Sequence, residues 1–264
     1  TTDSSGKGSS SAKLKNGRLV NLFAPQAFDA EFLSPVGFGA LMGILKNYEA
    51  INPFVSSTTD SLNRLKPGYE APVCIVTSLG HSPAEPSRNR TILIGLVRDA
   101  KSALATRFEL RAPNPKTNTY LVLAAAYMAM LDGIKAALTA EKTPKELEAS
   151  LSKKYGEEDF YLEKDREYRS ERDVFEDFTE EERQKLFGRA SATVWENLQG
   201  FADYPEKVAA ISGEGVITPI SLESYKDSIL SQWKTELHNR IIPNYMGEVR
   251  ECVRLHGEDA TDYD

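Results

Sequence analysis

Three short strand-like runs constrain the fold of this chain more than any other feature of its sequence. They lie at residues 72–77, 91–97 and 104–110. A loop rich in Pro and Gly, residues 80–86, separates the first two. The Asn16-Gly17 pair predicts a further hairpin with a two-residue turn. The first half of the chain should therefore contain a sheet.

The remaining patterns are helical. An apolar periodicity over residues 27–50 predicts a helix that stops at Asn52-Pro53, and another helix is expected at 120–138. Capping boxes begin at Thr143 and Thr179. A last helix should run over 222–255 with a kink at Pro243. The second half should thus be entirely helical.

The composition changes near residue 141. From there to residue 185 the chain has 16 acidic and 10 basic residues. We therefore expect one unit at 1–140 and a helical extension at 141–264. The charged segment should face solvent, and the helices after it should dock back on the first half through large apolar side chains: Phe187, Trp195, Phe201, Tyr225, Trp233 and Tyr245.

Charge and composition exclude several classes of protein. The chain has 264 residues and a net charge of −7, which argues against a dedicated nucleic-acid binder. Its best candidate for a membrane span is an uncharged stretch of 15 residues, shorter than the ~18 apolar residues that a spanning helix needs. Of the two cysteines, Cys74 lies in an apolar run and should be a buried thiol. We therefore expect a cytoplasmic protein without a membrane or nucleic-acid partner.

A row of alternating charges is the first candidate for chemistry. Arg107, Glu109 and Arg111 share one face of an expected strand, because successive side chains on a strand point to opposite faces. Guanidinium forks bind anions, and a carboxylate can bind a hard metal ion. The alternative is a solvent-facing edge strand whose charges pair with one another.

Two loops are the other candidates. Arg64 and Glu70 flank the Pro67-Gly68 turn, which could close over a substrate as a mobile lid or be an ordinary exposed turn. Arg88 and Arg90 stand just before a strand, where a pair of arginines suits phosphate, although a solvated loop is the alternative.

Taken in order, these pieces resemble the C-terminal part of the glutamine synthetase catalytic domain, in the larger bacterial form with a helical C-terminal extension. The similarity is concentrated in residues 52–135. It rests on five ordered blocks, which are Asn63 to Val73, Arg88 to Thr91, Arg107 to Pro115, Asn118 to Leu121 and Leu131 to Ile134. The resemblance implies an α+β fold in which helices cover an antiparallel half of a curved sheet, with the all-helical extension attached.

The resemblance also implies an activity. Members of this family ligate ammonia to the γ-carboxylate of glutamate through γ-glutamyl phosphate, using ATP and Mg or Mn, as homo-oligomeric rings. The matching positions assign Glu70 and Arg90 to catalysis. They assign Arg64 and Arg111 to glutamate, Arg107 and Arg90 to the nucleotide, and Glu109 to the metal. With a single metal carboxylate, the chain alone is expected to be inactive.

Three departures leave alternatives open. Histidines that the family usually has near this chain's start are replaced by Ser10 and Ala12, and a second phosphate-side arginine is replaced by Gly95. Arg98 would sit one step off the required face of its strand. These changes favour a non-catalytic relative that keeps the fold as a structural or regulatory oligomer. A γ-glutamyl ligase for another amine is the third alternative.

Overall fold

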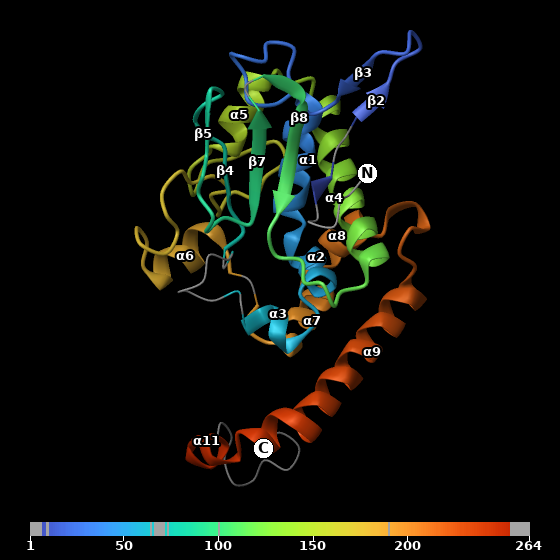
Figure 1. The fold of residues 1–264 in the computed structure, drawn as a ribbon, viewed down its shortest axis with the longest axis vertical. Helices are drawn as coiled ribbons and strands as arrows, with labels where there is room; N and C mark the ends of the chain where they lie inside the picture. Colours follow the sequence, from blue (N-terminus) through green and yellow to red (C-terminus); the bar gives the residue numbers. More distant parts are fainter. Residues whose placement is uncertain are drawn as a thin grey trace.

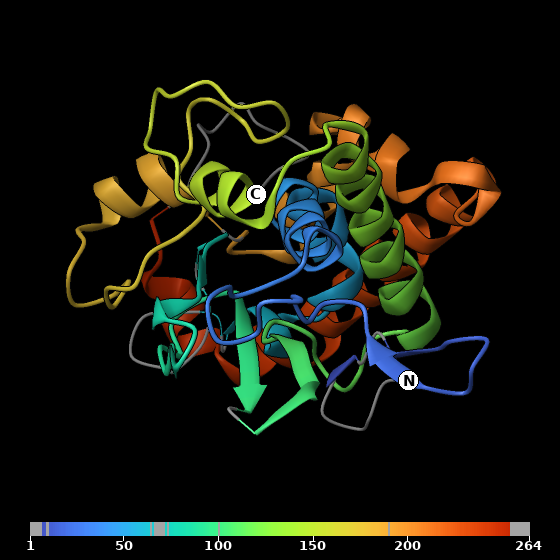
Figure 2. The same ribbon diagram turned by 90° about the horizontal axis from the view of Figure 1, so that it is seen from above.

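A small mixed sheet packed against a pair of long helices organises the molecule (Figure 1). The structure is a computed structural model, and it describes residues 7–8, 11–63, 65, 72, 74–99, 101–189 and 191–253. Further helices from the second half surround the helix pair, as the view from above shows (Figure 2). The α+β class predicted from the sequence is confirmed.

The main sheet has four strands in the order β1-β8-β7-β4. Neighbours are antiparallel except for β7 and β4, which run parallel. The bounds are β1 Lys7–Gly8, β4 Thr77–Ser78, β7 Ile94–Asp99 and β8 Ser102–Leu110. The strand expected at 72–77 is therefore shorter and starts later than predicted.

The expected loop at 80–86 is a short hairpin of β5, Gly80–Ser82, and β6, Glu85–Pro86. Gly80 has φ +103°, and an added Cβ there would lie 2.3 Å from the Glu85 carbonyl oxygen. Only glycine fits this close approach of the two strands.

The N-terminal hairpin is present, as predicted, with β2 at Ser11–Lys13 and β3 at Leu19–Asn21. Its turn is longer than expected. The Leu14 N–H donates to the Arg18 carbonyl at 2.9 Å, which encloses three residues, and Gly17 takes φ +81°. This is the three-residue loop with a left-handed last position. The Asn21 amide ties the hairpin to β8 by donating to the Thr106 carbonyl at 2.6 Å.

The predicted helix at 27–50 is two helices, which begin later and end later than expected. They are α1, Pro35–Lys46, and α2, Tyr48–Val55, and the short α3, Thr59–Asn63, follows. Ser34 sets the start of α1 because its Oγ accepts the Gly37 N–H at 3.0 Å.

The Asn52-Pro53 stop is wrong, because α2 continues through Pro53. Proline cannot bond the carbonyl one turn before it. That carbonyl, of Glu49, instead faces Gly200, where an added Cβ would lie 2.8 Å from the oxygen. The helix tolerates Pro53 at a point where the backbone of Gly200 packs against the Glu49 carbonyl.

Helix α1 and helix α4, Thr119–Thr139, touch backbone to backbone at three glycines. An added Cβ at Gly43 would lie 2.0 Å from the Ala129 carbonyl oxygen, and one at Gly133 would lie 2.1 Å from the Gly39 carbonyl oxygen. The two helices can approach this closely only because those positions carry no side chain.

Helix α4 is also long and apolar. It has 21 residues, its most apolar window has a mean hydropathy of 1.6, and 33% of that window is buried. It is the one helix among the described residues whose length and composition would let it cross a membrane, and the sequence analysis identified no such segment. Core helices of water-soluble proteins meet the same test. The packing of α4 on α1 accounts for its buried face.

The second half contains many helices but, contrary to expectation, is not entirely helical, because residues 152–179 form no helix and part of this segment pairs with β4. Both capping boxes are confirmed at Thr143 and Thr179. A short 3₁₀ turn, η1, covers Gly213–Gly215. The remaining helices up to the last are α5 Pro144–Leu151, α6 Glu180–Phe187, α7 Val194–Asp203, α8 Pro205–Ile211 and α9 Pro219–Glu236.

The last helix is interrupted near Pro243, as predicted. After α9 come a π-helix, η2 Leu237–Ile241, then α10 Ile242–Asn244 and α11 Met246–Glu251. The proline lacks the N–H that would continue the helical bonding, and the extra residue of a π-turn is one way to absorb that loss.

The prediction that large side chains after the charged segment dock on the first half is correct for some of these residues and wrong for others. Phe187 and Phe201 are buried, and Tyr225 and Trp233 pack against the core. The Tyr225 hydroxyl donates to the Pro53 carbonyl at 2.9 Å. Trp195 and Tyr245 instead remain 49% and 52% exposed.

The charged segment does not simply face solvent, because its Arg166 pairs with the half-buried Glu49 and its Glu163 pairs with the buried Lys207. Lys207 is 2% exposed and lies 3.0 Å from a Glu49 oxygen and 2.7 Å from a Glu163 oxygen. Arg166 pairs with the same two carboxylates. These two anions and two cations form a closed group that binds α2, the charged segment and α8 together. We call them the buried quartet.

Replacing Gly43 with alanine should separate α1 from α4. The new Cβ would meet backbone, which cannot move aside as a side chain can, so we expect a loss of about 1–3 kcal/mol in the free energy of unfolding. Urea unfolding of Gly43→Ala measures it. Gly247→Ala is the control, since no atom of the residues that the structure describes lies within 4 Å of an added Cβ there. Equal unfolding midpoints for Gly43→Ala and the unchanged protein would contradict the close contact.

The quartet should make stability depend on pH. Burial raises the pKa of Glu163, but Lys207 and Arg166 outweigh this and hold it below the ordinary 4.5. A lowered folded pKa stabilises the protein fully above pH 4.5, and this contribution disappears as the pH falls through the folded pKa. Glu163→Gln should therefore cost about 1–2 kcal/mol near neutral pH, less than in a fully buried pair because its side chain is 35% exposed, and progressively less below pH 4.5.

Urea unfolding between pH 7 and pH 3 tests this expectation. Glu158→Gln is the control, because Glu158 forms an exposed pair with Lys164 that should contribute little to stability. A Glu163→Gln deficit that stays constant across this pH range would show that the lost stability is not electrostatic.

Candidate functional site

Strand β8 carries a charged row on one face and core side chains on the other. Phe108 is 4% exposed and stacks on Phe23 with ring centroids 4.7 Å apart. Arg107, Glu109 and Arg111 alternate with it and are only half-buried. The solvated edge-strand alternative is wrong in one respect: β8 pairs with β1 on one side and β7 on the other, so it is an interior strand.

The sheet register fixes what stands beside this row. Gly95 of β7 and Lys7 of β1 lie opposite Glu109 on its two sides. Among the described residues, an added Cβ at Gly95 would meet only the Ile92 Cδ1, at 3.7 Å. The position where the family was expected to place an arginine is therefore open space next to Glu109.

Arg98 does not fill that space. Its guanidinium donates to the Glu31 and Phe32 carbonyls, each at 2.6 Å, and stacks over the Phe28 ring at 4.2 Å. Its neighbour Val97, not Arg98, pairs with Arg107, so Arg98 is one step off the face, as expected. Arg98 fixes the loop before α1.

Two hollows lie on either side of the β5–β6 hairpin. Arg107 lines one of about 470 Å³, together with Val97 and the hairpin prolines. Arg90 lines another of about 600 Å³, together with His81, Arg88, Glu171 and Asp173. Arg90 and Arg107, which the sequence analysis assigned to one nucleotide, thus face different hollows in this chain. Pro86 of the hairpin lines both.

Some of the expected site residues lie in the described part of the chain and others do not. Arg64, Glu70 and Ser10 lie outside the described residues. Ala12 is on β2, half-buried. Arg111 follows β8 directly, and its N–H donates to the Leu93 carbonyl at 2.9 Å, which holds it beside the start of β7.

A metal ion would not find a complete site among the described residues. No group of three or more His, Cys, Asp or Glu side chains lies close enough together in that part of the chain. Hard divalent ions take six or more oxygen ligands, and for Mg²⁺ these are usually one or two carboxylates together with waters and substrate phosphates. Glu109 can offer one carboxylate, so the described residues supply only part of a metal ion's coordination sphere.

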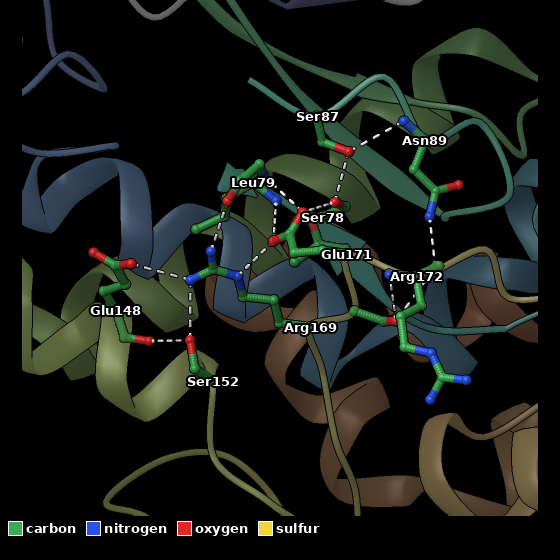
Figure 3. Close-up of polar contacts among 12 residues, drawn as sticks. Ser78, Leu79, Ser87, Asn89, Glu148, Ser152, Arg169, Glu171 and Arg172 are labelled. Carbon is green, nitrogen blue, oxygen red and sulfur yellow. Dashed lines mark hydrogen bonds and ion pairs between the residues drawn. The ribbon is translucent and has the colours of Figure 1, made fainter. Parts of the chain in front are cut away.

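Residues that the sequence analysis missed surround Arg90. Segment 168–174, within the charged segment, lies against the loop of residues 87–91, and Glu171 is at the centre of the contact (Figure 3). Acidic residues are so frequent in that segment that nothing in its pattern distinguishes Glu171.

Comparison with known proteins places this chain in a family. The family model "Glutamine synthetase, catalytic domain" matches residues 9–160, which is more than half of the chain. The chain therefore belongs to the glutamine synthetase family, and the resemblance stated from the sequence is confirmed. The match includes α5 and ends before α6.

Individual relatives agree. The chain is 42% identical over 121 residues to a glutamine synthetase of Escherichia coli (strain K12), covering 46% of this chain and 23% of that protein. It is 40% identical over 123 residues to one of Clostridium saccharobutylicum, covering 47% of this chain and 25% of that protein. The chain thus spans about a quarter of the length of these relatives.

A solved structure shows the same fold. The cryo-EM structure of Plasmodium falciparum glutamine synthetase superposes with a TM-score of 0.55, covering 93% of this chain and 44% of that one. At 20% sequence identity, this similarity concerns the fold alone.

Proposed function

We propose that this chain is the C-terminal part of the catalytic domain of a glutamine synthetase. The reaction is ATP-dependent ligation of ammonia to the glutamate γ-carboxylate through γ-glutamyl phosphate. The observation that carries this proposal is the β8 row. Two guanidinium groups flank a carboxylate on an interior strand whose other face is fixed in the core, and the position beside Glu109 is open.

Each charged residue then has a role. Arg107 binds the nucleotide, and Arg90 contacts the transferred phosphoryl group. Arg111 and Arg64 bind the carboxylates of glutamate, because a guanidinium fork matches a carboxylate with two parallel hydrogen bonds. Glu70 shields the intermediate from water and takes a proton from the bound ammonium. Phosphoryl transfer depends mostly on positioning and on positive charge around the moving oxygens, which is what these arginines provide.

Glu109 is proposed as one oxygen ligand of Mg or Mn. When bound, the ion neutralises charge on the ATP phosphates. The other ligands would be the ATP phosphates, waters and residues beyond those described, since no group of three or more metal-binding side chains lies together in the described part of the chain. The role of this chain toward the ion is to hold one carboxylate on a rigid strand between Arg107 and Arg111.

A cytoplasmic homo-oligomeric ring is the proposed setting, with glutamate, ammonia and ATP as ligands. The outer face of α4 exposes Tyr120, Tyr127 and Leu138, which is apolar surface suited to a neighbouring subunit.

A non-catalytic member of the family is the second candidate. The observation that favours it is Gly95, whose position leaves open space where a phosphate-binding arginine was expected. A ligase that uses another amine is compatible with the same residues.

The isolated chain should form no γ-glutamyl hydroxamate from glutamate, hydroxylamine, ATP and Mn. It holds one candidate metal carboxylate, whereas the ion needs several ligands. A colorimetric hydroxamate assay on the purified chain measures this, with a complete glutamine synthetase as the positive control. Turnover above the enzyme-free blank would overturn the expectation.

Arg111→Lys, made in a complete enzyme that carries this chain, should weaken glutamate binding selectively. Lysine keeps the charge but loses the planar fork, at a cost of about 1–3 kcal/mol, so the KM for glutamate should rise at least fivefold. The KM for ATP should change less.

The matched control is Arg18→Lys, an exposed arginine of the β2–β3 turn. Equal rises in both KM values would contradict the assignment of Arg111. An enzyme inactive with every amine tested, before any substitution, would favour the non-catalytic alternative.

A further inference from the structure

The loop of residues 87–91, which carries Arg90, is held by a segment outside the region that the family model matches. That model ends at residue 160. Segment 168–174 runs beside β4 in the parallel direction. The Thr77 N–H donates to the Tyr168 carbonyl at 2.8 Å, and the Ser170 N–H donates to the Thr77 carbonyl at 2.9 Å. This pairing brings Glu171 to the end of β4.

The Glu171 carboxylate collects four donors there (Figure 3). The Leu79 N–H donates to one oxygen at 3.1 Å, and the Gly80 N–H donates to the other at 2.8 Å. The Arg169 Nε donates at 2.7 Å, and the Ser78 hydroxyl completes the set. Burial raises the pKa of Glu171, but these donors outweigh it and hold the pKa below its ordinary value. The group is therefore an anion at neutral pH.

A relay of donors leads from this anion into the Arg90 loop. The Asn89 N–H donates to the Ser87 Oγ at 3.1 Å, and the Ser87 and Ser78 hydroxyls lie 2.6 Å apart. Because the Ser78 proton goes to Glu171, Ser87 must donate to Ser78. Every donor thus points toward the carboxylate, and such aligned chains polarise and strengthen one another.

A second brace reaches the same loop from the same segment. The Asn89 side-chain amide donates to the Arg172 carbonyl at 2.9 Å, and the Val174 N–H donates to the Thr91 Oγ1 at 3.1 Å. Asn89 and Thr91 are joined to each other through the Asn89 Oδ1, at 2.8 Å from the Thr91 nitrogen. The residues on both sides of Arg90 are therefore fixed to segment 168–174.

We propose that Glu171 is a positioning residue for Arg90: through Ser78 and Ser87 it sets the loop from which that arginine reaches the transferred phosphoryl group. This inference rests on the proposed function. It assigns the helical extension a role in the active site of its own chain, in addition to its packing on the first half.

Glu171→Gln in a complete enzyme that carries this chain is the principal test. Glutamine offers one carbonyl oxygen and an NH₂ that repels the donors now bound to the second oxygen, so the relay cannot form intact. We expect kcat to fall at least tenfold while the KM for glutamate stays within twofold. An unchanged kcat would overturn the proposal.

Two further variants separate positioning from stability. Ser78→Ala breaks the relay but leaves the Arg169, Leu79 and Gly80 contacts of Glu171, and it should reproduce the kcat defect. Glu148→Gln removes the charge of the other carboxylate that pairs with Arg169, at 3.1 Å, without touching the loop, and it should leave kcat unchanged. A kcat loss in Glu148→Gln as large as that in Glu171→Gln would identify a merely structural role and refute the proposal.

A double-mutant cycle with Arg90→Gln tests the proposed role of Glu171 separately from the proposed role of Arg90. If Glu171 acts through Arg90, Glu171→Gln should lower kcat little further in the Arg90→Gln background. Full activity of Arg90→Gln would refute the role of Arg90 in the proposed function. Impaired Arg90→Gln together with normal Glu171→Gln would leave that function standing and refute the role of Glu171.

The isolated chain provides a readout that does not depend on activity. Glu171→Gln should speed amide hydrogen exchange at Asn89 and Thr91 at least tenfold, and Glu148→Gln should not. Unchanged exchange at both amides in Glu171→Gln would show that the loop does not depend on the carboxylate.

Discussion

The backbone contact between α1 and α4 is the constraint on which the rest of the structure depends. Three glycines let the helices meet without side chains between them, which leaves the remaining faces of both helices to bury other elements. The sheet packs on one side of this pair, and α5 and α8 pack on others. The charged row of β8 is rigid because its opposite face is locked into this core through Phe108.

Charge binds the second half to that core. The buried quartet joins α2 to α8 by alternating anions and cations, so each carboxylate has two cationic partners and each cation has two carboxylates. Removing one member would leave an uncompensated charge in a partly buried place. A second polar group, around Glu171 and Arg169, connects α5, β4 and the Arg90 loop. The acidic composition of residues 141–185 thus serves contacts inside the fold.

The sequence predicted those features that depend on residues close together in the chain and missed those that depend on residues far apart. Alternation along residues 106–111, the capping residues Thr143 and Thr179, and the hairpin at Gly17 involve neighbours in the chain, and all three are present. The continuation of α2 through Pro53 was missed because it depends on Gly200, far away in sequence. The roles of Glu163 and Glu171 were missed for the same reason: each is one acid among many, and only the fold gives it partners. The assignments of Arg64 and Glu70 stay predictions.

The two cysteines differ in exposure, and this difference provides a measure of local opening in the chain. Cys74 is buried in a small cluster with Val174 and Phe187, next to the segment that braces the Arg90 loop, and burial raises its pKa to about 12. Cys252 is exposed. Only the thiolate attacks alkylating reagents. The exposed Cys252 is therefore alkylated at a rate that needs no opening of the fold, whereas Cys74 is alkylated only when this cluster opens. The ratio of the two alkylation rates measures how often the segment detaches, without any added label in the protein.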